Sequence, residues 1–314
     1  MNSIREWMLP AQGNEYAGQV DDLYMFLVWL CLALFLLIGV LTIAFAVKYR
    51  RKGEATETPH ITHHLGLEFI WSVLPLIICM GVFFWGFQGF MRFVVVPNDA
   101  KEILVTGKKW VWAFEYPDGI GVTKTLHVEV GKPVKLVMTS EDVLHSFYIP
   151  GLRIKQDVVP GRYVNLSFVP EKVGRQQVFC AEYCGKSHSD MMGEIIVESH
   201  DQYVYYMTKG IDEELKDIPL PVLGKMVYEN KGCNNCHSLD GTRGQGPSFK
   251  GVYGKNEKFR DGTSQVVDEN YIRQSINEPL AKVVDGFEPV MPTFQGLFRD
   301  REYLAIIQFI KEQK

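Results

Sequence analysis

The chain has 314 residues, of which 46% are hydrophobic and 22% are charged. This length predicts two or three domains rather than one. The formal net charge of -4 excludes the strongly basic character of a nucleic-acid-binding protein, so no nucleic-acid partner is expected.

Two long apolar segments lie near the N-terminus. Residues 23–47 and 69–90 contain no charged residue, and each is long enough to cross a membrane as a helix of about 20 residues. A buried core helix is the alternative, but two such segments in tandem are atypical of soluble proteins. The sequence therefore predicts a two-helix hairpin in membrane lipid at residues 23–96, preceded by an external segment at residues 1–22.

The charges that flank these segments predict their orientation. Lys48, Arg50, Arg51 and Lys52 follow the first segment, whereas the residues before it carry four acidic side chains and the single basic residue Arg5. Cytoplasmic loops of membrane proteins are enriched in Lys and Arg. We therefore expect the hairpin loop in the cytoplasm, and both termini on the outer side of the membrane.

Short β-rich segments separated by Gly and Pro follow between residues 97 and 200. Residues 134–139, 163–169 and 193–198 are examples. Alternating segments at this spacing favour an antiparallel sandwich or barrel. His145 lies at the end of one such segment and Cys180 at the end of another, so one pole of the sheets is expected to hold both residues.

The most distinctive motif is C-A-E-Y-C-G-K-S-H-S-D-M, from Cys180 to Met191. Two thiolates, an imidazole and a thioether in one loop, with His145 upstream, select copper over oxygen-loving ions. Two cysteines exceed the needs of a mononuclear blue-copper site, so a binuclear electron-transfer centre with bridging thiolates is predicted. A disulfide between Cys180 and Cys184 is the alternative, but it would need neither Met191 nor His188.

The last part of the chain, residues 223–314, is predicted to be mainly helical. It follows a linker at residues 201–222 that is rich in charge and proline, with most of its charges at residues 212–217. Residues 301–311 have an amphipathic pattern. We expect them to pack on the helix that contains Tyr228.

The string Cys233-Asn-Asn-Cys236-His237 is the signature of c-type haem attachment. The two cysteines bind the haem covalently, and the histidine becomes an iron ligand. A redox dithiol and half of a zinc site are alternatives, but no cysteine or histidine follows His237 to complete a zinc site. Met291 is predicted to be the second axial ligand of the iron. Met226 is its rival, but it precedes the motif and is expected in the core.

Together these features resemble subunit II of cytochrome c oxidase, in the bacterial variety with a cytochrome c domain fused to its C-terminus. The likeness covers nearly the whole chain. It implies a multidomain fold with a two-helix transmembrane hairpin, an all-β cupredoxin-like sandwich with a CuA site at residues 97–200, and an all-α class I cytochrome c domain at residues 223–314. It also implies a bacterial inner membrane, and a binuclear CuA and a covalent haem c as cofactors.

The resemblance assigns six copper ligands: Cys180 and Cys184 as bridges, His145 and His188 with one copper each, Met191 as a weak ligand, and Glu182 through its backbone carbonyl. It further implies that the Glu182 side chain reaches a magnesium ion at the boundary with subunit I.

Three other residues receive roles from the same likeness. Trp110 would lie above the copper, where electrons enter the site, whereas its neighbours in the aromatic run are expected in the core, namely Trp112, Phe114 and Tyr116. The carbonyl of Pro247 would orient the haem-binding histidine. Glu68 would lie at the mouth of a proton channel into subunit I; a helix N-terminal residue favoured by the helix dipole is the alternative.

The implied function is an electron relay. An external donor would reduce the haem c, and the electrons would pass to CuA and on to a haem in subunit I, where oxygen is reduced to water with proton translocation. The donor would be a cytochrome, a high-potential iron–sulfur protein or an upstream complex, and other oxidase subunits would be partners. The alternatives are a CuA subunit of a nitric oxide reductase and a membrane-anchored copper-binding module.

Overall fold

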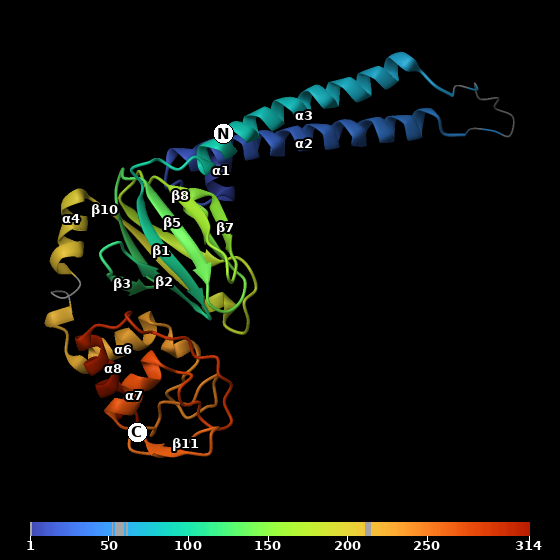
Figure 1. The fold of residues 1–314 in the computed structure, drawn as a ribbon. Helices are drawn as coiled ribbons and strands as arrows, with labels where there is room; N and C mark the ends of the chain where they lie inside the picture. The colour runs from blue at the N-terminus through green and yellow to red at the C-terminus, as the bar shows by residue number, and fades with distance from the viewer. Residues whose placement is uncertain (1, 52, 54–59, 61, 211–214) are drawn as a thin grey trace. The chain divides into compact units, whose positions relative to one another are not determined.

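The computed structural model describes residues 2–51, 53, 60, 62–210 and 215–314 (Figure 1). Contacts between Cα atoms divide the chain into two compact units, Met1–Val95 and Val96–Lys314. Each unit is considered by itself. Lys52 of the predicted cytoplasmic loop and residues 211–214 of the predicted linker lie outside the described residues.

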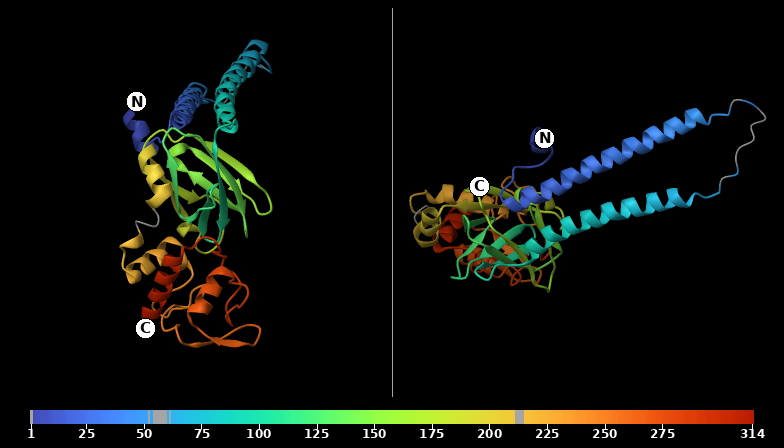
Figure 2. Two further views of the ribbon diagram at one scale, coloured as in Figure 1. Left: turned by 60° about the vertical axis from the view of Figure 1, so that its left-hand side comes forward. Right: turned by 90° about the horizontal axis from the view of Figure 1, so that it is seen from above.

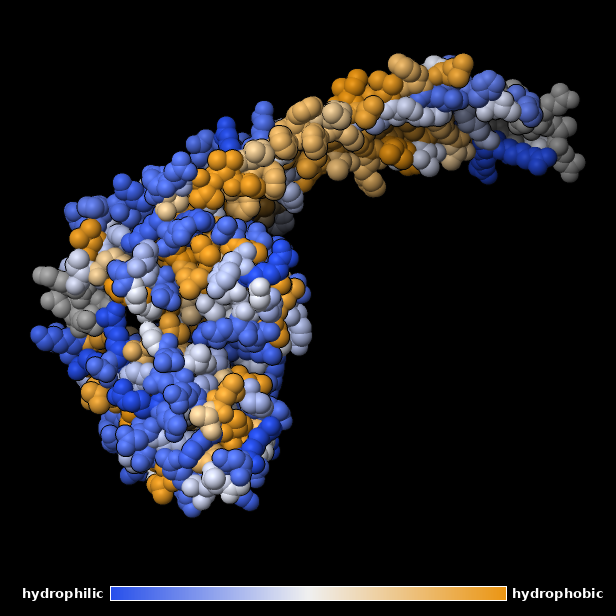
Figure 3. All heavy atoms as spheres, in the orientation of Figure 1, coloured by the Kyte–Doolittle hydropathy of each residue, from blue (hydrophilic) through white to orange (hydrophobic). Residues whose placement is uncertain are grey.

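The first unit consists of helices α1 (Asn2–Met8), α2 (Glu15–Lys48) and α3 (Leu65–Val94). Helices α2 and α3 are long and apolar enough to cross a membrane, and they run alongside each other (Figure 2). Their outward surface is largely apolar (Figure 3), as in helices surrounded by lipid. Helix α2 begins before the apolar segment because the side chain of Asn14 accepts a hydrogen bond from the backbone N–H of Ala17 at 2.9 Å.

The second unit begins with two packed five-stranded sheets, which confirms the predicted sandwich. The first has the order β3 (Gly121–Thr123), β2 (Val111–Glu115), β1 (Lys101–Lys108), β5 (Val134–Ser140) and β8 (Val164–Phe168). The second has the order β4 (Thr125–Glu129), β10 (Met192–Glu198), β9 (Gly174–Cys180), β6 (His145–Ile149) and β7 (Ile154–Val158).

The sheets are mixed, whereas the sequence favoured purely antiparallel pairing. Strand β1 pairs with β5 in parallel, and β10 pairs with β4 in parallel. The chain crosses to the second sheet at β4 and then returns, so that β5 runs in the same direction as β1. The core between the sheets contains the fully buried aromatic residues that were expected there, Trp112, Phe114 and Tyr116.

The rest of the second unit is mainly helical. After the sandwich come α4 (His200–Tyr205), a π-helical segment (Tyr206–Gly210), α6 (Leu220–Asn230), α7 (Glu269–Asn277) and α8 (Asp300–Glu312). A small hairpin is formed by β11 (Asn256–Lys258) and β12 (Ser264–Val266). Short 3-10 turns lie at Pro150–Leu152, His188–Asp190 and Cys233–Asn235.

Helices α6 and α8 pack closely, as the amphipathic pattern of residues 301–311 predicted. The rings of Tyr228 and Phe309 lie 5.5 Å apart. A Cβ atom on Gly224 would lie 2.5 Å from the Cβ of Phe309, so only glycine allows this approach. The expectation that Met226 lies in the core is wrong, because Met226 is 37% exposed and its neighbour Val227 faces the core instead.

Candidate functional site

Strand pairing brings His145 to the end of the Cys180 loop. Strand β6 begins at His145 and β9 ends at Cys180, and the two strands pair antiparallel with Phe147 opposite Cys180. The imidazole of His145 is fully buried, and its Nδ1 lies 3.8 Å from Cys180 Sγ. Two residues that are far apart in the sequence therefore share one pole of the sandwich.

The other donor atoms of the loop converge on two sulfur atoms. Cys180 Sγ and Cys184 Sγ lie 3.8 Å apart, too far for a disulfide bond of about 2.05 Å. Cys184 Sγ lies 3.5 Å from His188 Nδ1 and 3.7 Å from Met191 Sδ. The backbone carbonyl of Glu182 lies 3.2 Å from Cys180 Sγ, whereas its side chain is exposed.

This donor set fits copper. The ligand atoms of His145, Cys180 and Cys184 all lie within 4.8 Å of one another and are buried. A hydrogen bond from Cys184 lowers the pKa of Cys180, and the same bond raises the pKa of Cys184. The pair thus stabilises one thiolate already, and thiolates are the form of cysteine that binds metals.

Asp142 contacts His145 beside this cluster of donor atoms, although the sequence did not indicate it. Its Oδ1 lies 2.8 Å from His145 Nε2, and its carboxylate accepts hydrogen bonds from the backbone N–H groups of Val143 at 2.6 Å and Lys109 at 2.7 Å. Burial alone would lower the pKa of His145, but hydrogen bonds to Asp142 and Cys180 outweigh it and raise that pKa. An acidic residue three positions before the ligand histidine was the available signal.

Trp110 lies between the copper loop and the CNNCH segment, within the second unit. Its indole Cζ2 would be 3.2 Å from a Cβ atom on Gly185, the residue after Cys184. On the other side, the carbonyl of Trp110 accepts a hydrogen bond from the Asn235 side chain at 3.4 Å. Trp110 is only 5% exposed, and its indole N–H has no hydrogen-bond partner among the described residues.

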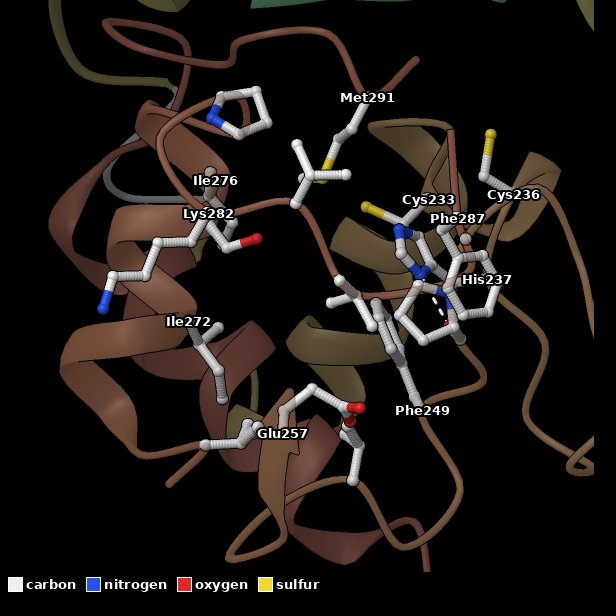
Figure 4. A pocket seen from close by; sticks show the side chains of 18 of the residues that line it. Cys233, Cys236, His237, Phe249, Glu257, Ile272, Ile276, Lys282, Phe287 and Met291 are labelled. Atoms are coloured by element: carbon white, nitrogen blue, oxygen red, sulfur yellow. Dashed lines mark hydrogen bonds between the residues drawn. The ribbon is translucent and has the colours of Figure 1, made fainter. Parts of the chain in front are cut away.

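A large, mostly apolar pocket lies beside the CNNCH segment. The hollow measures about 1080 Å³ with its open mouth included, and its lining is largely apolar. Cys233, Cys236, His237 and Met291 line it, and His237 and Met291 both face the hollow (Figure 4). The residues predicted as haem ligands therefore share one pocket.

The local contacts of His237 leave one ring nitrogen free for a metal. Its Nδ1 donates a hydrogen bond to the carbonyl of Pro247 at 2.7 Å, and its ring stacks on Phe249 at 4.6 Å. Burial lowers the pKa of His237, although the bond to Pro247 opposes this, so the neutral imidazole is favoured. A Cβ atom on Gly246 would lie 2.5 Å from the His237 ring, so glycine is required there.

The two cysteines of the CNNCH segment are free thiols. Burial raises the pKa of Cys233 to about 12 and that of Cys236 to about 11. Neither thiol is consumed by a disulfide, and both line the pocket. The pocket, the thiols and the oriented imidazole together fit a covalently attached haem.

Glu68 has a local structural role in the first unit. Its Oε1 accepts a hydrogen bond from the backbone N–H of His64 at 3.0 Å, and His64 Nδ1 accepts one from the backbone N–H of Leu67 at 3.1 Å. These two bonds cap the N-terminus of α3. The place of Glu68 at a proton channel stays a prediction.

Three segments of the chain match known protein families. Residues 8–88 match the family "Cytochrome C oxidase subunit II, transmembrane domain", and residues 120–200 match "Cytochrome C oxidase subunit II, periplasmic domain". Residues 221–314 match the family "Cytochrome c".

Two relatives are described as cytochrome c oxidase subunit 2. The cytochrome c oxidase subunit 2 of Alkalihalophilus pseudofirmus is 28% identical, over 98% of this chain and 90% of that protein. The subunit 2 of Metridium senile is 30% identical, over 47% of this chain and 69% of that protein. Among solved structures, the periplasmic domain of subunit II of cytochrome oxidase from Bradyrhizobium japonicum is 29% identical in sequence. The match covers 36% of this chain and 94% of the solved chain, with a TM-score of 0.34.

Proposed function

Because the chain belongs to the cytochrome c oxidase subunit II family and carries a cytochrome c domain after its copper domain, we propose that it is the electron-input subunit of a terminal oxidase. It receives electrons one at a time at the Cys233–His237 pocket and delivers them to the Cys180–Met191 loop. From there they pass to a haem in subunit I, for reduction of oxygen to water with proton translocation.

One observation carries this proposal: donor atoms from four residues converge on the two neighbouring sulfur atoms of Cys180 and Cys184. We assign the bridging role to these two cysteines and single-copper roles to His145 and His188, with Met191 and the carbonyl of Glu182 as weaker ligands. A binuclear CuA held by such residues supplies one-electron transfer. Both sulfur atoms are buried in a short, folded loop, which favours ligand positions that change little between charge states.

Trp110 is the proposed connection between the two cofactor sites. Its ring lies on Gly185, next to Cys184, and its backbone carbonyl contacts Asn235, which lies inside the CNNCH segment. The Trp110 side chain is buried, so water is excluded from this short path. The chain itself therefore provides a contact route between its haem pocket and its copper loop.

In the haem pocket, each protein group has a separate task. Cys233 and Cys236 anchor the haem covalently, and His237 binds the iron in the orientation that the Pro247 carbonyl fixes. Met291 faces the same hollow and completes the coordination as the ligand type that raises haem potential.

The remaining assignments concern partners. The donor is a cytochrome, a high-potential iron–sulfur protein or an upstream complex. We assign to the exposed side chain of Glu182 a magnesium ion at the boundary with subunit I, and to Glu68 the mouth of a proton channel into subunit I. The hairpin loop faces the cytoplasm, and both termini face the periplasm. The copper domain comprises residues 97–200, and the cytochrome c domain comprises residues 223–314.

Purification of the intact membrane complex tests the proposal. We expect a near-infrared band of binuclear copper, a Soret band that survives denaturation as covalent haem, and oxygen consumption. In rapid mixing with a one-electron donor, the haem c band should change before the copper band. One weakly held copper without covalent haem would instead identify a copper-binding module, and co-purification with a subunit that reduces nitric oxide would identify the other alternative.

A further inference from the structure

Two side chains of the copper domain, Val111 and Lys124, lie against the residue that precedes Cys233. A Cβ atom on Gly232, the residue before Cys233, would lie 3.8 Å from Val111 Cβ and 3.9 Å from Lys124 Cε. Val111 is buried in the same apolar cluster as Leu223 of α6. The sandwich and the haem-attachment segment are therefore packed against each other within the second unit.

Lys124 brings a positive charge to this contact. Its Nζ donates a hydrogen bond to the backbone carbonyl of Glu229, in the last turn of α6. Cations are stabilised at the C-terminal end of a helix. Burial lowers the pKa of Lys124, and the negative charges of Glu229 and Asp190 only partly offset this.

Two other lysines near the haem pocket are balanced by carboxylates. Lys108 lies 2.9 Å from Glu141 and also donates to the carbonyl of Thr293 at 3.0 Å. Lys231 lies 3.2 Å from Glu302. In the described part of the chain, neither Lys124 nor Lys282, which lines the pocket and donates to Gln265 at 2.8 Å, has a carboxylate within 4.0 Å. Lys124 is the one of these two that the copper domain supplies.

We propose that Lys124 of the copper domain raises the reduction potential of the haem attached at Cys233 and Cys236, and that docking of the haem segment on the copper domain is therefore tighter when the haem is reduced. This inference rests on the proposed function. One-electron reduction removes one positive charge from the haem, and no bond forms or breaks. A nearby ammonium group repels the oxidised state more than the reduced state.

The coupling between charge and docking is reciprocal. If docking favours the reduced state by a given factor, reduction favours docking by the same factor. The reduced segment is held against Trp110, where the electron leaves. After transfer the oxidised segment is held less tightly, which frees it to meet the next external donor. Lys124 thereby links release of the segment to completion of the transfer.

The test compares full-length variants in the purified complex. Lys124→Gln removes the charge, and Lys124→Arg retains it. Lys135→Gln is the matched control, because Lys135 belongs to the same domain but pairs with Glu102 on β1. The ratio of reduced to oxidised haem c is measured at fixed ambient potential. Hydrogen exchange of the Gly232–Asn235 backbone is measured in both redox states.

We expect K124Q to lower the ratio about threefold, which corresponds to about 28 mV at 59 mV per tenfold for one electron. K124R and K135Q should stay at the wild-type value. Backbone exchange should be slower in the reduced wild type than in the oxidised, and K124Q should lose this difference.

Three results would overturn the inference alone: covalent haem with an unchanged ratio in K124Q, an equal fall in K124R, or equal exchange in both redox states of the wild type. Absence of covalent haem from the wild-type chain would overturn the proposed function as well.

Discussion

Asp142→Asn is expected to weaken copper binding without unfolding the domain. The carboxylate serves donors on both oxygens: His145 Nε2 and the Val143 N–H share Oδ1, and the Lys109 N–H binds Oδ2. An asparagine amide keeps only one acceptor oxygen, so either the histidine side or the Lys109 side loses its partner. Loss of a group that orients a metal ligand lowers affinity about 10–100-fold, which is about 1.4–2.7 kcal/mol.

The assay is a titration of the purified complex with a competing copper chelator, followed through the near-infrared copper band. Asp157→Asn is the matched control, because Asp157 accepts a hydrogen bond from Ser146 at 2.7 Å, one residue after His145, but does not contact the ligand. The covalent haem band reports that the chain is intact. An affinity of D142N within threefold of wild type, or an equal loss in D157N, would refute the orienting role of Asp142.

The remaining predictions concern the metal ligands and the haem domain. Cys184→Ser should abolish the binuclear copper spectrum and leave the covalent haem intact; a retained spectrum would contradict bridging. Met291→Ala should lower the haem potential and convert the iron toward high spin, as visible spectroscopy and redox titration would show. Glu302→Gln should cost about 3–5 kcal/mol in urea unfolding followed at the Soret band, because the buried Lys231 loses its ion pair at 3.2 Å, whereas the amide oxygen keeps the bond from the Arg299 N–H that caps α8. The double variant with Lys231→Met should recover most of that stability, and failure to recover would argue against an unpaired charge as the cause.

The sequence identified the copper loop because its donor residues lie within twelve positions of one another, from Cys180 to Met191. His145 was placed correctly for a different reason: strand ends meet at one pole, and β6 does pair with β9. The same reasoning could not place Asp142, since an acidic residue near a histidine is common in loops and only its measured contacts give it a role.

Features that depend on tertiary contacts were harder to predict. Helix α2 starts at Glu15 because of the Asn14 cap, whereas hydropathy begins only at Leu23. Met226 was expected in the core but is exposed. The pattern of apolar residues in α6 does not tell which of its faces the partner helix covers, and α8 covers the face that carries Tyr228. Lys124 meets a carbonyl 105 residues away, and no periodicity in the sequence signals such a pairing.

Backbone geometry next to the ligands explains how the two sites keep their close contacts. Gly185, which follows Cys184, has a backbone φ angle of 122°, a conformation that other residues rarely adopt. Any side chain at this position would also press on the Trp110 ring. Gly246 lies beside Pro247, where a side chain would displace the His237 ring from its hydrogen bond to the Pro247 carbonyl. In both places a missing side chain lets a functional ring approach within van der Waals distance. The positions of the Trp110 and His237 rings therefore depend on the absence of a side chain at Gly185 and Gly246.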